Sequence, residues 1–338
     1  MHHPIPLANP SEDQFADLAN GLRMCYRTYG NPSHPAIVLI AGLGLQLVSW
    51  PLPLIEGLVA AGFYVVTPDN RDMGRSSYLP QTPPARWRLF VNWLPAGHYR
   101  IQDMANDMPQ LLDALSIAKA HVLGMSMGGM IAQNFAAQHA DRVLSLTSIF
   151  STTGNPRVGR AAGSTLLRML FSATPTTLEM AQANYVRMMR HIGNRKVPGI
   201  EAAWRDYVAQ AWARTTPEQA QPGYERQIAA ILTSGDRSAY LYRIDTPTLV
   251  IHGDKDRIVH PSGGGATARS INGAQMHTVV GMRHQLDAQV TPSLLEVIVP
   301  HLRMAQSLAA GESPSNAPDP STVAGAAHAA TSTDTANR

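Results

Sequence analysis

The chain has few of the features that mark secreted or membrane-spanning proteins. Cys25 is the one cysteine among 338 residues, so no intrachain disulfide can form and no oxidising compartment is implied. It lies in MCYRTYG, residues 24–30, which is typical of a strand, and its expected role is that of a small buried apolar side chain. The N-terminus lacks the charged and apolar regions of a secretory signal. No run of about 18 apolar residues indicates a membrane span. We therefore expect a cytoplasmic protein, with peripheral association with a membrane surface left open.

Patterns typical of nucleic-acid, nucleotide or metal sites are also lacking. Lys and Arg number 27 against 24 Asp and Glu, but they form no basic cluster and no RNA-binding signature accompanies them. No His and Cys spacing indicates zinc, and no glycine-rich phosphate loop follows a strand. We expect no cofactor, no metal and no nucleic-acid partner. A small molecule is the expected ligand, and the sequence does not define the oligomeric state.

Short apolar runs rich in branched residues predict six buried strands. Their hydrophobicity is continuous rather than alternating, which is typical of a parallel sheet covered on both faces. These runs cover residues 36–41, 63–67, 121–124, 144–149, 247–252 and 276–280. Helical periodicity lies between them at residues 51–61, 101–115, 128–139 and 292–310, with prolines expected to weaken the second helix at Pro109 and interrupt the last at Pro300. The alternation of strand and helix predicts an α/β fold.

The alternation stops near residue 150, and helical periodicity alone continues to about residue 240. We interpret the chain as an N-terminal arm (1–20), a core (21–150), a helical cap (151–240), a second part of the core (241–308) and a disordered tail (309–338). The cap carries eleven Lys and Arg against six Asp and Glu. That excess could attract an anionic substrate or membrane, but solvated helix faces are the interpretation we favour.

The segment GMSMGG, residues 124–129, indicates a reactive serine. Gly124, Ser126 and Gly128 form a G-x-S-x-G pattern between a predicted strand and a predicted helix, and this context favours a nucleophile over a glycine turn with an incidental serine. On such a tight turn the neighbours must be small, and the N-terminus of the following helix favours developing negative charge.

A serine nucleophile needs a histidine base, which in turn needs a carboxylate. After a G-x-S-x-G turn the expected chain order is serine, acid, histidine. Asp254 and Asp256 follow the strand at 247–252, and we favour Asp256 as the acid because Asp254 is better placed to shape the turn. His284 lies in the loop before the closing helix and is the expected base.

Two backbone N–H groups are expected to bind the oxyanion. One belongs to Met127, directly after the serine. The other belongs to the loop after the strand at 36–41, where Gly42 turns the chain and Leu43 is the expected donor, with a neighbouring position as the alternative.

Charged residues alternate in sign along the segment TPDNRDMGRSS, residues 67–77. A carboxylate or metal site is one interpretation. Because Asp69, Arg71, Asp72 and Arg75 balance in charge, we prefer an ion-paired structural loop.

Together, AGLG, PDNRDMGRS, HVLGMSMGGMIAQ, HGDKDRIV and GMRH resemble the α/β-hydrolase superfamily, in particular the bacterial carboxylesterase and lipase-like branch related to anthracycline methylesterases. The resemblance covers residues 20–305. It implies an eight-stranded, mostly parallel sheet with helices on both faces, an inserted helical cap and no cofactor. By motif match, Ser126 is the nucleophile, Asp256 the acid and His284 the base. The chain departs from the family at Ala41, where His often precedes Gly, and at Arg283, where a small residue usually precedes the histidine.

These observations predict a serine hydrolase that cleaves carboxylic esters through an acyl-enzyme. The same triad could instead open a lactone or enol-lactone, hydrolyse a carbon–carbon bond or act as a perhydrolase, since the pocket decides. A ligand-binding protein that has lost turnover is a further alternative. Four cap methionines are expected either to line an apolar acyl pocket or to form the core of the cap, namely Met169, Met180, Met188 and Met189.

Overall fold

A single eight-stranded sheet organises the fold in the computed structural model, which describes residues 12–85, 88, 97–170 and 173–311. The strand order is β1-β2-β4-β3-β5-β6-β7-β8. β2 pairs antiparallel with β1 and β4, and the other pairs are parallel. The predicted α/β fold is thus confirmed. The strands are β1 (Gln14–Asp17), β2 (Arg23–Tyr29), β3 (Ala36–Ile40), β4 (Tyr64–Pro68), β5 (Ala120–Met125), β6 (Val143–Ile149), β7 (Thr248–Gly253) and β8 (Gln275–Val279).

Each predicted strand begins and ends within one residue of the bounds of an observed strand, but the prediction missed β1. It lies inside the segment interpreted as an N-terminal arm, and only one of its four residues is buried. An edge strand that pairs on one side only does not need an apolar run, so β1 leaves no hydrophobic signal. Cys25 lies in β2 and is fully buried, as expected of a small apolar side chain.

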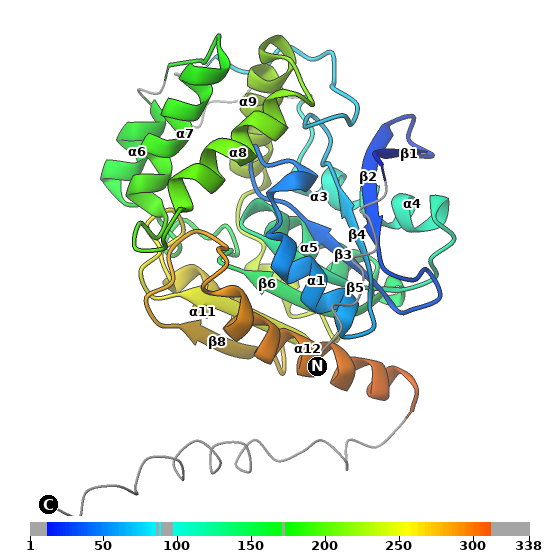
Figure 1. Cartoon of the computed structure of the whole chain (residues 1–338). Helices are drawn as coiled ribbons and strands as arrows, with labels where there is room; N and C mark the ends of the chain where they lie inside the picture. Colours follow the sequence, from blue (N-terminus) through cyan, green and yellow to red (C-terminus); the bar gives the residue numbers. More distant parts are fainter. Residues whose placement is uncertain (1–11, 86–87, 89–96, 171–172, 312–338) are drawn as a thin grey trace, which may run out of the picture.

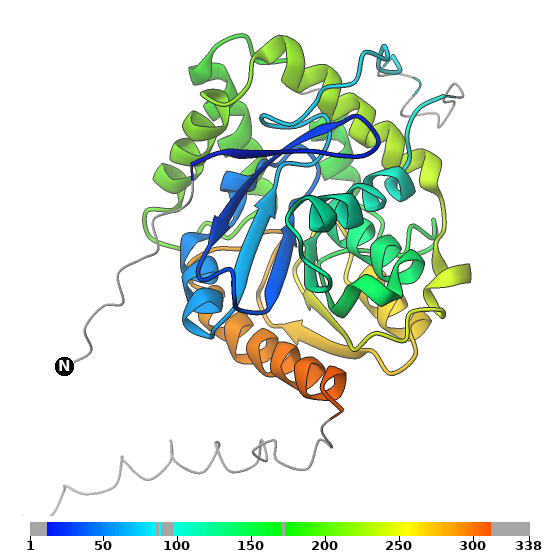
Figure 2. The same ribbon diagram turned by 90° about the vertical axis from the view of Figure 1, so that its right-hand side faces the viewer.

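Helices cover both faces of the sheet (Figures 1 and 2). On one face pack α3 (Ile101–Ala105), α4 (Asp107–Ala114) and α5 (Met127–Gln138), and on the other pack α1 (Leu52–Ala60) and α12 (Thr291–Ala309). Alternate residues of β3 enter the two cores: Val38 and Ile40 face the first, Ile37 and Leu39 the second. This burial on both faces explains why β3 is apolar throughout.

Two prolines behave differently from the prediction. The helix expected over residues 101–115 is divided at Asn106, and Pro109 is the third residue of α4, where no intrahelical acceptor is available for a backbone N–H. The interruption expected at Pro300 is wrong, because α12 continues through it. Burial of Leu294, Ile298 and Leu302 against the sheet keeps α12 together despite the lost hydrogen bond.

The described residues between 151 and 240 form helices and contain no strand. They are α6 (Gly163–Leu170), α7 (Leu178–Ile192), α8 (Ile200–Trp212), α9 (Pro217–Ser234) and α10 (Ser238–Leu241), and α11 (Ser262–Ser270) follows β7. Figure 1 shows α6 to α9 gathered on one side of the sheet. The tail predicted from residue 309 overlaps the end of α12, and residues 312–338 lie outside the described residues. Within the described residues, no helix combines the length and apolarity needed to cross a membrane.

The loop after β4, residues 69–77, is ion-paired, but its partners come from elsewhere in the chain rather than from the loop itself. Asp69 pairs with Arg214 and Asp72 with Arg226, both from the helical segment. Arg71 pairs with Asp107, the first residue of α4, and Arg75 pairs with Asp13, directly before β1. Arg214, Arg226 and the fully buried Arg237 are therefore cap cations that do not belong to solvated faces.

We expect Arg71→Met to lower the free energy of unfolding by about 3–5 kcal/mol, because it leaves the buried Asp107 carboxylate without its cation. Adding Asp107→Leu should regain most of that loss. Arg23→Met is the control, since the Arg23–Asp17 pair is exposed and should contribute less than about 1 kcal/mol. Urea unfolding measures all three, and equal losses for Arg71→Met and Arg23→Met would contradict the assignment.

Candidate active site

The predicted site residues lie at the carboxyl ends of neighbouring parallel strands. Ser126 follows β5, Asp256 follows β7 and His284 follows β8, while residues 42–47 follow β3. Carboxyl ends of parallel strands meet at one edge of a sheet, where open α/β folds bind ligands. The helical segment leaves the sheet after β6 and therefore begins at the same edge.

Ser126 is the single residue at which β5 turns into α5. Its φ of 55° and ψ of −119° are unusual for a residue with a side chain, and such strain persists only where the surroundings fix it. The Ser126 N–H donates to Ile149 O at 2.9 Å, and the Ser151 hydroxyl donates to Ser126 O at 2.7 Å. Strand β6 and the residues after it thus fix the conformation of the turn.

The glycines that flank Ser126 are required by close backbone contacts. A Cβ at Gly124 would lie 2.2 Å from Gly128 O, and a Cβ at Gly128 would lie 2.0 Å from Ile40 O. These contacts involve backbone atoms, which cannot swing aside as a side chain can. The G-x-S-x-G spacing therefore reflects the approach of β3, β5 and α5 to one another.

Hydrogen bonds join the three residues that the sequence indicated as nucleophile, base and acid. His284 Nε2 lies 3.0 Å from Ser126 Oγ, and His284 Nδ1 lies 2.7 Å from Asp256 Oδ2. The Phe150 ring packs against the imidazole, with the two centroids 4.5 Å apart. The backbone N–H of His284 donates to Ile192 O at the end of α7, so this helix also restrains the loop that carries His284.

Asp256 is held as a carboxylate by its neighbours. Its Oδ1 accepts from the N–H groups of Ile258 and Val259 at 2.8 and 3.0 Å. Burial raises the pKa of Asp256, but the nearby imidazoles of His284 and His252 outweigh it, and the pKa lies well below its usual range. His252 Nε2 lies 3.4 Å from Asp256 Oδ2. We did not anticipate this histidine, although its position four residues before Asp256 was visible in the sequence.

Asp254, the alternative acid, does not contact His284 in the described structure. Its Oδ1 accepts from Gly281 N at 2.6 Å, and its carboxylate pairs with Lys255 at 3.0 Å. These contacts join the turn after β7 to the turn after β8.

The two predicted oxyanion donors lie beside Ser126. Met127 is the first residue of α5, so its N–H has no intrahelical acceptor. A Cβ at Gly42 would lie 3.3 Å from Ser126 Cβ, which places the loop after β3 directly against the serine. In that loop Gly44 N donates to Gln227 Oε1 and Leu45 N donates to Gly42 O. The Leu43 N–H has no acceptor among the described residues, which leaves it available to a ligand.

A cavity of about 830 Å³ opens onto Ser126 and His284. Its volume lies within the range of small-molecule sites. Three of the four methionines, Met169, Met188 and Met189, line it, whereas Met180 does not and is 36% exposed. Met188 and Met189 also pack in the apolar cluster that α7 forms with α8, so the two expected roles coincide at these residues. Within the described ranges, no group of three or more His, Cys, Asp or Glu side chains could hold a metal ion.

We expect Gly128→Ala to unfold the protein or to lower its melting temperature strongly, because the added methyl group would overlap Ile40 O and Ala41 O. Gly163→Ala is a matched control, since nothing lies within 4 Å of a Cβ at that helical position. Thermal unfolding followed by circular dichroism measures both. A Gly128→Ala protein as stable as Gly163→Ala would show that the close contact is not required.

Comparisons with known proteins agree with this architecture. The family model described as the alpha/beta hydrolase fold matches residues 35–286. The chain is 30% identical over 297 residues to the rhodomycin D methylesterase DnrP of Streptomyces peucetius, covering 82% of this chain and 93% of that protein. It is also 30% identical over 239 residues to a putative carbamate hydrolase, RutD, of Stutzerimonas stutzeri, covering 70% and 80%.

Solved structures show the same fold. The enol-lactonase of Burkholderia xenovorans LB400 superposes with a TM-score of 0.65 at 26% identity, covering 86% of this chain and all of that one. With a family match across most of its length and a relative 30% identical over most of both proteins, the chain belongs to the α/β-hydrolase fold family.

Proposed function

We propose that the protein is a serine hydrolase that cleaves carboxylic esters through an acyl-enzyme intermediate. The observation that carries the proposal is the chain of hydrogen bonds from Ser126 through His284 to Asp256, opening onto the cavity. A histidine so placed activates a serine hydroxyl, which is a weak nucleophile on its own. The esterase and hydrolase relatives support the same class of reaction.

In the first half of the proposed reaction, Ser126 Oγ attacks the carbonyl carbon of the ester while His284 Nε2 takes the hydroxyl proton. Asp256 holds the Nδ1–H and stabilises the imidazolium that forms. The Leu43 and Met127 N–H groups bind the oxyanion of the tetrahedral intermediate. The intermediate collapses when the carbon–alkoxide bond breaks and His284 gives its proton to the departing alcohol.

Water completes the cycle. His284 takes a proton from the water, whose oxygen attacks the acyl carbon and forms a second tetrahedral intermediate. That intermediate collapses when the bond between the acyl carbon and Ser126 Oγ breaks, which releases the carboxylic acid, and His284 returns the proton to Ser126 Oγ. The same residues thus serve both half-reactions, and no further group is needed for the proton transfers.

The cavity favours a substrate with a substantial apolar part. Besides the methionines, its wall includes Trp50, Phe150 and Ile192. Apolar walls with few polar groups bind ligands mainly by removing them from water. A relative named as a methylesterase, 30% identical over most of both chains, makes methyl esters of bulky acids sensible first substrates.

Opening of an enol-lactone is a second candidate. It uses the same attack on an ester carbonyl, except that the alcohol stays attached to the acyl group. The 26% identity with the enol-lactonase across that protein's whole length favours it over carbon–carbon bond hydrolysis.

Ser126→Ala should abolish turnover of p-nitrophenyl esters from acetate to palmitate, because it removes the hydroxyl that forms the acyl-enzyme. We expect a loss of at least about 10⁴-fold in kcat. Ser33→Ala, at an exposed turn, should retain full activity. A fluorophosphonate probe should label wild-type protein and not Ser126→Ala. An unlabelled wild type that hydrolyses no ester or enol-lactone would contradict the proposal.

Asp256→Asn and Asp254→Asn separate the two candidate acids. Asn at position 256 would turn an amide donor toward His284 Nδ1 and favour the wrong tautomer, and we expect kcat to fall about 10³–10⁴-fold. Asp254→Asn removes only the ion pair with Lys255, which is not bonded to the imidazole of His284. The kcat of this variant should therefore stay within about threefold of wild type. Steady-state kinetics on one ester measures both, and the reverse order of effects would make Asp254 the acid.

A further inference from the structure

The loop that carries Leu43 is held by the helical cap. We call residues 42–47 the oxyanion loop. The N–H of Gly44 donates to Oε1 of Gln227, on α9, at 3.0 Å. The same amide donates through Nε2 to Arg71 O at 2.9 Å, so Gln227 joins the oxyanion loop to the loop after β4. Gln227 is fully buried and does not line the cavity.

Helix α9 also packs directly on the oxyanion loop. Gly44 has a φ of 68°, and a Cβ there would lie 2.8 Å from the Tyr224 ring. Tyr224 precedes Gln227 by three residues, so the two side chains share a face of the helix. One face of α9 therefore both covers Gly44 and binds its N–H.

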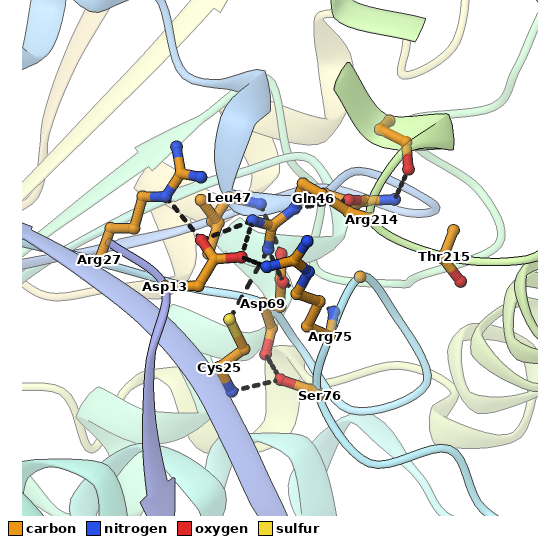
Figure 3. Close-up of polar contacts among 12 residues, drawn as sticks. Asp13, Cys25, Arg27, Gln46, Leu47, Asp69, Arg75, Ser76, Arg214 and Thr215 are labelled. Atoms are coloured by element: carbon orange, nitrogen blue, oxygen red, sulfur yellow. Dashed lines mark hydrogen bonds and ion pairs between the residues drawn. The ribbon is translucent and has the colours of Figure 1, made fainter. Parts of the chain in front are cut away.

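A second set of contacts holds the far end of the oxyanion loop (Figure 3). The buried Gln46 side chain donates to Ala211 O at the end of α8 and accepts from Arg214 Nε, each at 3.0 Å. Arg214 pairs with Asp69, whose other oxygen accepts from Leu47 N at 2.7 Å. The middle of the loop, at Gly44, and its far end, at Gln46, are thus bound to the segment between β6 and β7.

These two anchors affect the backbone of Leu43, which lies between the anchored Gly44 and the residue next to Ser126, Gly42. Gly44 N–H is bound by Gln227, and Leu45 N–H is bound within the loop by Gly42 O. The Leu43 N–H belongs to the Gly42–Leu43 peptide, whose carbonyl oxygen accepts from Leu45 N at 3.1 Å. The next peptide, Leu43–Gly44, is held by the bond from Gly44 N to Gln227. The two peptides meet at the Leu43 Cα, so the bond to Gln227 restricts the directions in which the Leu43 N–H can point.

We propose that Gln227 is a positioning residue for the oxyanion hole, and that Arg214 assists it through Gln46. The inference rests on the proposed function. It assigns Gln227 no contact with substrate: the side chain acts by holding the Leu43 N–H where the oxyanion forms. A donor fixed before the reaction needs no reorganisation as charge develops, which is the source of its catalytic effect.

Gln227→Met tests the proposal, because it keeps the length of the side chain and removes both hydrogen bonds. We expect kcat for a p-nitrophenyl ester to fall roughly 10- to 100-fold, somewhat less than the loss caused by removing an oxyanion donor outright. KM should change by less than about threefold, since the cavity wall is unaltered. Gln221→Met, on the same helix and bonded to Glu225 instead, should behave as wild type.

A transition-state analogue separates positioning from general damage. A trifluoromethyl ketone adds to Ser126 and develops an oxyanion, whereas the amide of the same acid binds without one. Gln227→Met should weaken the ketone by the same factor as kcat and leave the amide affinity unchanged. Equal weakening of both ligands, or a loss of activity that follows the melting temperature, would overturn the positioning role.

Gln227→Asn is the second variant, needed if Gln227→Met does not fold. It keeps an uncharged amide but is one methylene shorter, so it cannot reach both Gly44 N–H and Arg71 O, and its kcat and ketone affinity should fall together and by less than in Gln227→Met. Wild-type kinetics in the Gln227 variants would overturn this inference and leave the proposed function intact. A wild type without turnover or labelling at Ser126 would overturn the proposed function itself, and this inference with it.

Discussion

The buried ion pair between Asp69 and Arg214 joins the loop after β4 to the helical segment between β6 and β7, and the rest of the arrangement depends on it. Asp69 leaves the sheet at the end of β4, and Arg214 lies 145 residues later, after α8. Both side chains are at most 5% exposed, so neither charge is solvated when its partner is lost. Asp13, from the chain before β1, pairs with the same guanidinium. Three distant segments therefore meet at one cation.

The candidate site depends on this arrangement because some of its residues are held by the sheet and others by the helical segment. Ser126 and Met127 are fixed by the sheet and α5, whereas the loop that carries Leu43 is bonded to the side chains of Gln227 and Arg214 from the helical segment. The backbone N–H of His284, the proposed base, donates to Ile192 O at the end of α7, so the loop that carries it also contacts the helical segment. The helical segment thus contributes more than a wall of the cavity: it holds two of the loops that surround the serine.

The sequence revealed the local features of this site and not the distant ones. The spacing around Ser126 was readable because close backbone contacts leave no room for a Cβ, and that requirement appears as glycine. β1 was invisible because an edge strand needs no apolar run. The partner of Asp69 was invisible for another reason: any of 27 cations could satisfy a carboxylate, and only the folded chain selects Arg214. Gln227 carries no pattern at all, since a buried amide looks like a surface one until its neighbours are known.

Arg214 and Arg226, which extend from the helical segment to the loop after β4, limit how this protein could be redesigned. Asp69 and Asp72 are each matched by a cation from the cap, Arg214 and Arg226. A cap grafted from another hydrolase without those cations would leave two carboxylates buried and unpaired, a cost that packing elsewhere does not offset. The helical segment and the loop therefore form one transferable module, although α3, α4, β5, α5 and β6 all lie between them along the chain. Exchange of substrate range by cap grafting would succeed only if the loop after β4 travels with the cap.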